Sequence, residues 1–426
     1  MTEAIKQLYI ETSSRCNINC RMCMRGSSIK SQGDMELGLF NKLTPVFPGL
    51  KFINFSGIGE PLLNPELFEM LRIAKRLMPR DGETGFTTNG MLIDREIAGE
   101  LVSSGLDKIV ISIDGINPET YGYIRRGGDF ERIKRGIGFL NSAKEKMKKS
   151  APKIGIEFVV MRRNLDELPL AIEFARENNI EFVIISHLLP YSEEMVGEVV
   201  FELFSQESID VFESAKIKAE KESINFNNYY NFSFFRNEII PKDYIERLNS
   251  LINQTYDEAG KFDIFLNLPK LLERNGKNFS KAKEVFEKTQ SLAKKLNIEL
   301  SLPPINSSAK RECKFIKNRA CFVSWDGDVS PCIRLMYSHK FQLNGASREV
   351  CSLSFGNVKD RDINEIWNTP KFTSLRESVD QFVFPHCPDC PAYGSCGYLD
   401  RLEGDCFGNE EPCGDCLWGR NMMQCL

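Results

Sequence analysis

The residues "SSRCNINCRMC" (Ser13–Cys23) directly follow "KQLYIET" (6–12), a short run rich in β-forming side chains that predicts a strand. Three cysteines, Cys16, Cys20 and Cys23, therefore share one tight loop after the first strand. A site with four protein ligands is closed, whereas a site with three leaves one position free for another molecule. The loop predicts a reactive site. The alternative is a zinc loop completed by a distant residue.

From residue 6 to about 190, short β-branched runs alternate with amphipathic helical stretches. Strands alternating with helices predict repeated βα units and a parallel sheet, whose binding residues gather at the carboxyl ends of the strands. Asp94 and Asp166 are expected to be helix N-caps. Further strands are expected at residues 51–57, 83–89, 107–114, 153–160 and 181–187, and helices are expected to begin near Met35, Pro65, Asp94, Phe130 and Asp166.

The chain has 426 residues, of which 42% are hydrophobic and 27% charged, as is typical of a soluble globular protein with two or three domains. Its formal net charge of -4 argues against a nucleic-acid partner. The sequence contains no apolar run of the roughly 20 residues that a membrane helix needs, and it begins without a signal-peptide pattern. We expect a cytoplasmic protein with no membrane partner.

The fourteen cysteines are unevenly distributed: three occur by residue 23 and eleven occur from Cys313 onward. A reducing compartment disfavours structural disulfides, so this clustering predicts metal or cluster ligation. A zinc-rich tail with a few buried free thiols is the alternative. We expect three parts: a core at 1–194, a mainly helical bridge at 195–305, and a cysteine-rich domain at 306–426.

The CxxxCxxC loop after the first strand resembles that of the radical S-adenosylmethionine (SAM) superfamily. This resemblance implies a partial (β/α)6 TIM-like barrel with a [4Fe–4S] cluster on Cys16, Cys20 and Cys23, whose fourth iron binds SAM. Reductive cleavage of SAM would give a 5'-deoxyadenosyl radical that abstracts hydrogen from a substrate. Met22 stands where many members have an aromatic or other hydrophobic residue before the third cysteine.

Three further motifs follow the next strands: "SGIGEP" (56–61), "TTNG" (87–90) and "SIDG" (112–115). The first resembles the family's GGEP motif, with Ile58 in place of the usual small residue. By this resemblance Glu60 would accept hydrogen bonds from the SAM ammonium. Arg125 could meet a carboxylate or form a solvated helix end. The expected SAM-binding residues are Gly57, Gly59, Glu60, Pro61, Thr88, Asn89, Ser112 and Asp114.

The tail resembles the SPASM extension of radical SAM enzymes, since Gly327 precedes Cys332 by the family's interval and "CPDCPAYGSC" matches its CxxCx5C pattern. The family's next cysteine would fall at Asp400. By analogy, one or two auxiliary [4Fe–4S] clusters are expected, the first on Cys313, Cys321 and Cys332 and the second on Cys387, Cys390 and Cys396. Their remaining ligands would come from Cys406, Cys413, Cys416 and Cys425, and Cys351 would be a free thiol.

"CFVSWDGDVSPC", "EIWN" and "DCFGNEEPCGDCLW" resemble the maturases associated with tungsten-containing oxidoreductases. This resemblance implies a maturase that acts on a protein, peptide or metal cofactor, with a tungsten oxidoreductase and an electron donor such as ferredoxin or flavodoxin as partners. Two alternatives stay open: a SPASM enzyme that crosslinks or oxidises a small precursor peptide, and a non-catalytic iron–sulfur or zinc adaptor. His187 ends a strand at the active edge and could contact a ligand or be an ordinary buried histidine.

Overall fold

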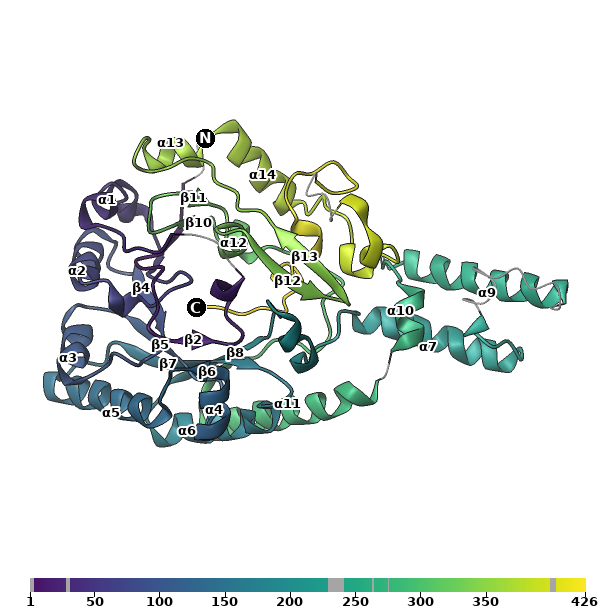
Figure 1. The fold of residues 1–426 in the computed structure, drawn as a ribbon, viewed down its shortest axis with the longest axis horizontal. Coiled ribbons are helices and arrows are strands. Elements are labelled where there is room, and N and C mark those ends of the chain that lie inside the picture. The colour runs from purple at the N-terminus through teal and green to yellow at the C-terminus, as the bar shows by residue number, and fades with distance from the viewer. Residues whose placement is uncertain (1–3, 28–30, 229–240, 263, 275, 399–403) are drawn as a thin grey trace.

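The fold was established from a computed structural model, which describes residues 4–27, 31–228, 241–262, 264–274, 276–398 and 404–426. A curved sheet forms the wall of an open barrel, and helices cover its outer side (Figure 1). Helices α7 and α9 project away from the barrel as an arm. None of the helices in the described ranges is long and apolar enough to cross a membrane.

The main sheet contains nine strands of the described chain, in the order β11–β10–β1–β3–β4–β5–β7–β8–β9. Neighbouring strands pair in parallel, except that β11 is antiparallel to β10. The barrel is open because β11 and β9 lie at opposite ends of this order. The strands are β1 (Gln7–Ile10), β3 (Phe52–Asn54), β4 (Glu83–Thr88), β5 (Lys108–Ser112), β7 (Lys153–Val160), β8 (Phe182–His187), β9 (Glu299–Ser301), β10 (Ala320–Val323) and β11 (Val329–Ser330).

Helices pack on the outer side of the barrel because each presents one apolar face to the sheet. Two short sheets lie outside the main one: β2 (Asn19–Cys20) with β6 (Arg125–Arg126), and β12 (His339–Leu343) with β13 (Ala346–Val350). The helices are α1 (Leu37–Asn41), α2 (Leu67–Leu77), α3 (Arg95–Ser103), α4 (Pro118–Ile124), α5 (Phe130–Met147), α6 (Leu168–Glu177), α7 (Gln206–Lys221), α9 (Lys242–Gly260), α10 (Leu268–Glu273), α11 (Lys277–Leu296), α12 (Lys314–Lys317), α13 (Ile363–Trp367) and α14 (Pro370–Asp380).

The six strands expected from the sequence are confirmed, and so is the N-cap Asp94, whose Oδ1 accepts a hydrogen bond from the Ile97 N–H at 2.9 Å. The expected N-cap Asp166 is wrong. A short 3₁₀ turn (Leu165–Glu167) precedes α6, and the Asp166 carboxylate instead pairs with Lys281 of α11. The short strands β9, β10 and β11 were not expected, because each has only two to four residues.

Residues 418–426 run from the cysteine-rich tail into the barrel interior (Figure 1). The Leu426 side chain packs against Val110, Phe182 and Ile184 on the inner face of the sheet. Its carbonyl oxygen accepts hydrogen bonds from the Tyr9 hydroxyl at 3.3 Å and from Asn54 Nδ2 at 3.2 Å. The tail therefore joins strands on opposite sides of the open barrel.

Candidate functional site

The three-cysteine loop is held in place by backbone pairing with other motifs at the carboxyl ends of the strands. Cys20 lies in β2, which pairs with Arg125 and Arg126 of β6. The Arg15 carbonyl accepts a hydrogen bond from the Glu60 N–H at 2.7 Å, which joins the loop to "SGIGEP". Cys16, Cys20 and Cys23 are each partly exposed.

Two glycines permit "SGIGEP" to approach the loop this closely. A Cβ atom added at Gly59 would lie 2.2 Å from the Ser13 carbonyl oxygen, and one added at Gly57 would lie 2.2 Å from Cγ of Glu11. Both distances are far below van der Waals contact, so a side chain at position 59 would displace the backbone of the cysteine loop and one at position 57 would displace the Glu11 side chain. The glycines are therefore required by packing between the two motifs. Pro61 is buried and opens a short 3₁₀ turn.

The Glu60 side chain links two strand ends. Its carboxylate is 1% exposed and accepts hydrogen bonds from the Leu62 N–H at 3.1 Å, the Thr88 hydroxyl at 2.7 Å and the Asn89 N–H at 2.7 Å. Burial raises the pKa of Glu60, and these donors partly offset the rise. The carboxylate thus holds two of the expected SAM-binding residues, Thr88 and Asn89, and its contact with the SAM ammonium stays a prediction. The backbone of the motif remains next to the cysteine loop.

Asn89 connects the "TTNG" motif to the cysteines. Its Nδ2 donates to Asn17 Oδ1 at 2.7 Å and lies 3.6 Å from Cys16 Sγ. The neighbouring Thr88 holds Glu60, as described above. The structure thus brings Asn89 to the cysteine loop, whereas Thr88 acts on the loop through another side chain.

Asp114 and Arg125 form a buried ion pair beside the second cysteine, with 2.6 Å between Asp114 Oδ2 and Arg125 Nε. Asp114 is fully buried, and its Oδ1 accepts a hydrogen bond from the Val159 N–H at 2.8 Å. Arg125 Nη1 lies 3.7 Å from Cys20 Sγ. Asp114 therefore orients a guanidinium towards a thiol. Ser112 lies at the end of β5, 7% exposed.

The chemistry of the loop fits a metal-bound thiolate. Burial raises the pKa of Cys20 to about 12, and Arg125 offsets part of this rise. At neutral pH such a thiol is protonated unless a metal stabilises its anion. The adjacent guanidinium is suited to compensate the charge of that anion.

In the tail, one group of four cysteines contains Cys313, Cys332, Cys413 and Cys416. Burial raises the pKa of Cys313 to about 11 and also raises those of Cys332 and Cys413, and the Cys416 thiolate adds to the rise at all three. This mutual influence places the four thiols within range of one another's charge. The structure therefore completes this group with both cysteines of "CGDC" (413–416).

A second group of four contains Cys387, Cys390, Cys396 and Cys406. Burial raises the pKa of Cys387, with contributions from Cys406 and Cys396, and burial raises the pKa of Cys406, with contributions from Cys396 and Cys390. The two groups adjoin each other: a Cβ atom at Gly414 would lie 2.8 Å from Cys387 Sγ.

Both CxxC segments of the tail carry a buried aspartate paired with a buried arginine. Asp415 Oδ1 lies 2.5 Å from Arg334 Nη2, and Asp389 Oδ2 lies 2.5 Å from Arg420 Nη2. All four side chains are less than 10% exposed. The sequence analysis missed these pairs. The aspartate at the third position of both "CPDC" and "CGDC" was the available signal, but no pattern indicates the arginine partners.

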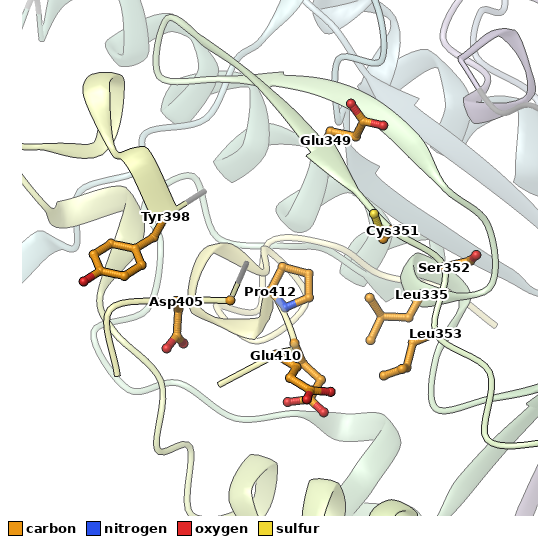
Figure 2. Close-up of a pocket in the computed structure, with 11 residues that line it drawn as sticks. Leu335, Glu349, Cys351, Ser352, Leu353, Tyr398, Asp405, Glu410 and Pro412 are labelled. Carbon is orange, nitrogen blue, oxygen red and sulfur yellow. The ribbon is translucent and has the colours of Figure 1, made fainter. Parts of the chain in front are cut away.

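Three cysteines of the tail lie apart from both groups. Cys321 is fully buried in β10 among core side chains such as Val323 and Trp367, so the expected ligand role of Cys321 does not fit. Burial and the charge of Glu157 raise the pKa of Cys425, and no cysteine contributes, so Cys425 is not part of either group. Cys351 is exposed in a pocket whose lining includes Glu349, Asp405 and Glu410 (Figure 2). Asp400 lies outside the described residues.

Within the described ranges, no three side chains of the cysteine, histidine or carboxylate type converge on a point that would hold a single metal ion. A four-iron cluster distributes its ligands over separate iron atoms, so its thiolates need not converge on one point. Tyr191 is half-buried and packs against the cluster that contains Met24 and Tyr337, and the charges of both Cys23 and Cys416 contribute, after burial, to the raised pKa of its hydroxyl.

Comparison with known protein families identifies the class of enzyme to which this fold and these three groups of cysteines belong. Residues 10–175 match the radical SAM superfamily, and residues 313–391 match the SPASM iron–sulfur cluster-binding domain. The chain belongs to the radical SAM superfamily and carries a C-terminal SPASM domain. This membership implies a SAM-binding [4Fe–4S] cluster and auxiliary clusters.

One relative is similar over nearly the entire chain. It is the tungsten-containing aldehyde ferredoxin oxidoreductase cofactor-modifying protein of Pyrococcus furiosus, 28% identical over 428 residues, which cover 99% of this chain and 97% of the relative. A probable GTP 3',8-cyclase of Methanocaldococcus jannaschii is 32% identical over 197 residues, 45% of this chain and 62% of that protein.

Solved structures support the fold. Streptococcus suis SuiB bound to S-adenosylmethionine matches 96% of this chain and 76% of its own, with a TM-score of 0.51 and 13% identity. The protein anSMEcpe with bound AdoMet matches 98% and 90%, with a TM-score of 0.50 and 18% identity.

Proposed function

We propose that this radical SAM enzyme modifies the metal cofactor of a tungsten-containing oxidoreductase. The observation that carries the proposal is the similarity over 99% of the chain to the cofactor-modifying protein, which includes both the three-cysteine loop and the cysteine-rich tail. The GTP cyclase matches less than half of the chain and therefore supports the radical SAM core alone.

In this proposal Cys16, Cys20 and Cys23 hold the SAM-binding cluster. When bound, the cluster and SAM supply a 5'-deoxyadenosyl radical for hydrogen abstraction. Arg125 compensates charge at Cys20, and Asp114 orients Arg125. The backbone of "SGIGEP" binds the SAM methionine moiety beside the loop, while Glu60 fixes that backbone in place.

The two tail groups hold auxiliary clusters with four protein ligands each: Cys313, Cys332, Cys413 and Cys416 in one, and Cys387, Cys390, Cys396 and Cys406 in the other. Met24, which follows Cys23, lies in an apolar cluster. Tyr191, Cys313 and Cys332 pack against the same cluster, and this contact between the two sites supports a role in electron transfer. A ferredoxin or flavodoxin would be the electron donor, and the tungsten oxidoreductase the protein partner.

The proposal keeps the division of the chain into a core at 1–194, a bridge at 195–305 and a SPASM-type domain at 306–426. The sheet crosses these boundaries, because β9 comes from the second part and β10 from the third. The core and the tail are thus parts of one barrel wall.

The first experiment measures 5'-deoxyadenosine after anaerobic cluster reconstitution and chemical reduction. The native protein should form it, and a variant with Cys16, Cys20 and Cys23 changed to alanine should not. A tungsten oxidoreductase isolated without this protein is then added. An increase in its activity, together with a mass change of its extracted cofactor, supports the proposal. An unchanged cofactor combined with modification of a small precursor peptide would favour the peptide-modifying alternative.

A further inference from the structure

Glu11 lies between the end of β1 and the three-cysteine loop, and its side chain is 1% exposed. The carboxylate accepts hydrogen bonds from two separate parts of the chain. Oε1 accepts from the Ile58 N–H of "SGIGEP" at 2.9 Å. Oε2 accepts from the Trp325 N–H at 3.3 Å and from the Tyr337 hydroxyl, both in the cysteine-rich tail. One buried carboxylate thus joins the expected SAM-binding loop to the tail.

The side chains of Glu11 and Trp325 pack closely against the segments that they join. Gly57 allows Glu11 to lie directly under "SGIGEP", since a Cβ atom there would collide with the Glu11 side chain. Trp325 also reaches the other side of the cysteine loop, because a Cβ atom at Gly33 would lie 2.3 Å from its ring. Gly33 in turn exchanges hydrogen bonds with Ser14, two residues before Cys16.

Tyr337 is connected to the first group of tail cysteines. Cys332 caps a short 3₁₀ turn (Ile333–Leu335), and Tyr337 follows this turn by two residues. The Tyr337 ring is fully buried in an apolar cluster that also contains Met24, next to Cys23. Ile58, Cys313 and Cys332 pack against the same cluster. A change in the backbone around Cys332 would therefore move the group that donates to Glu11.

We propose that Glu11 and Tyr337 are positioning residues through which the auxiliary site of Cys313, Cys332, Cys413 and Cys416 sets the backbone of the SAM-binding loop. The inference rests on the proposed role of "SGIGEP" in binding SAM. A filled auxiliary site holds the turn at Cys332 in place. Tyr337 and Trp325 then fix the Glu11 carboxylate, and this carboxylate in turn fixes the Ile58 N–H. SAM binding at the first cluster is then stronger when the auxiliary site is filled.

The test measures SAM affinity from the change that SAM produces in the electron paramagnetic resonance (EPR) spectrum of the reduced N-terminal cluster. Tyr337→Phe removes one hydroxyl and keeps the ring. It should raise the SAM dissociation constant by about tenfold, the usual effect of losing one buried hydrogen bond, without loss of iron. Tyr244→Phe is the matched control, because the Tyr244 hydroxyl accepts hydrogen bonds from Asn225 and Asn228 in the projecting arm and, among the described residues, none from the cysteine sites, and the SAM affinity of this variant should equal that of the native protein.

Three further variants keep the test decisive. Glu11→Gln preserves the shape of the side chain and should weaken SAM binding in the same direction. Cys332→Ala should empty the auxiliary site and weaken SAM binding, whereas the exposed Cys351→Ala should do neither. Native affinity in both Tyr337→Phe and Glu11→Gln would overturn the inference. A native protein that shows no response to SAM would instead contradict the proposed function.

Discussion

The loop at residues 16–23 and the tail after residue 313 both gather cysteines, but they do so differently. The loop brings together three thiols from eight consecutive residues, and they stay partly exposed beside glycines. The tail brings together two groups of four from segments up to about a hundred residues apart, and most of these residues are likewise partly exposed, while Cys387 is buried and Cys406 is exposed. The contrast separates a site that keeps one position for a small molecule from sites that the protein alone completes.

The two regions also resemble each other, because both place guanidinium groups near thiols. In the core, Arg125 approaches Cys20 and is held by Asp114. In the tail, Arg334 is held by Asp415 between Cys413 and Cys416. Each arginine is buried with a carboxylate partner, which limits the cost of removing its charge from water. Charge compensation is therefore common to open and closed sites, and the number of thiols distinguishes them.

The largest effect is expected from removing one ligand of a closed group. Cys413→Ala should lose about four iron atoms per chain, because a four-iron cluster that normally has four thiolates loses one of them. Cys321→Ala, in the sheet core, should keep all its iron. Iron and sulfide analysis after anaerobic reconstitution provides the measurement. Equal iron loss in both variants would contradict the grouping of the tail cysteines.

Breaking the arginine–aspartate pair of the tail should cost stability. Arg334→Gln leaves the Asp415 carboxylate buried without its partner, which typically lowers the free energy of unfolding by about 3–5 kcal/mol. Arg361→Gln is the control, since Arg361 forms a solvent-exposed pair with Glu365 and should change stability by less than about 0.5 kcal/mol. Anaerobic denaturant titrations compare the free energies of unfolding of the two variants with that of the native protein. A similar small loss in both would show that the buried pair is unimportant.

The open site should be sensitive to glycine replacement at one position. Gly59→Ala places a methyl group against the Ser13 carbonyl, so the loop must shift, and SAM affinity should fall at least about tenfold. Gly38→Ala, in α1 with no atom within 4 Å of the added Cβ, should bind SAM normally. Equilibrium dialysis with the reconstituted proteins measures both. Normal binding by Gly59→Ala would remove the motif from the SAM site.

A smaller, pH-dependent effect is expected at His187, which ends β8 but contacts no cysteine. Burial lowers the pKa of His187 from its ordinary 6.5 to about 4, and the Pro304 carbonyl, 2.8 Å from Nε2, offsets part of the shift. The unfolded chain therefore binds this proton more readily, so the stability contributed above pH 6.5 is lost as the pH falls toward 4.

Protonation of His187 in the unfolded chain should lower the free energy of unfolding of the native protein by about 1 kcal/mol between pH 7.5 and pH 5.5. The His187→Gln variant should lack this part of the pH dependence. Thermal unfolding of both proteins at the two pH values measures it. Parallel pH dependence of the two proteins would show that the ring is not buried as described.

Much of the core followed from local sequence. The six strands and the N-cap Asp94 have clear periodicity and capping signals, and the motifs at successive strand ends meet because parallel strands share an edge. The predicted N-cap at Asp166 is wrong because an aspartate before a helix can cap it or bind elsewhere, and its partner Lys281 lies 115 residues away in the chain.

The tail was less predictable for a physical reason. Spacing places cysteines along the chain, but the partners of a cluster are decided by which loops meet in space. Cys321 has the spacing of a ligand and lies in a buried strand, whereas Cys413 and Cys416 join Cys313 and Cys332 from far along the chain. Likewise, Glu60 has the family's position, but spacing could not show that its carboxylate accepts hydrogen bonds from Thr88 and Asn89.

The most direct test of the contrast between open and closed sites is EPR spectroscopy of the reduced, reconstituted protein with and without SAM. It would use the native protein, the variant with Cys16, Cys20 and Cys23 changed to alanine, and a variant with Cys387, Cys390, Cys396 and Cys406 changed to alanine. SAM should alter the spectrum of the native protein and of the variant that lacks the four tail cysteines. It should leave the spectrum of the variant that lacks Cys16, Cys20 and Cys23 unchanged. A SAM-induced change in the variant that lacks the three-cysteine loop would contradict this expectation.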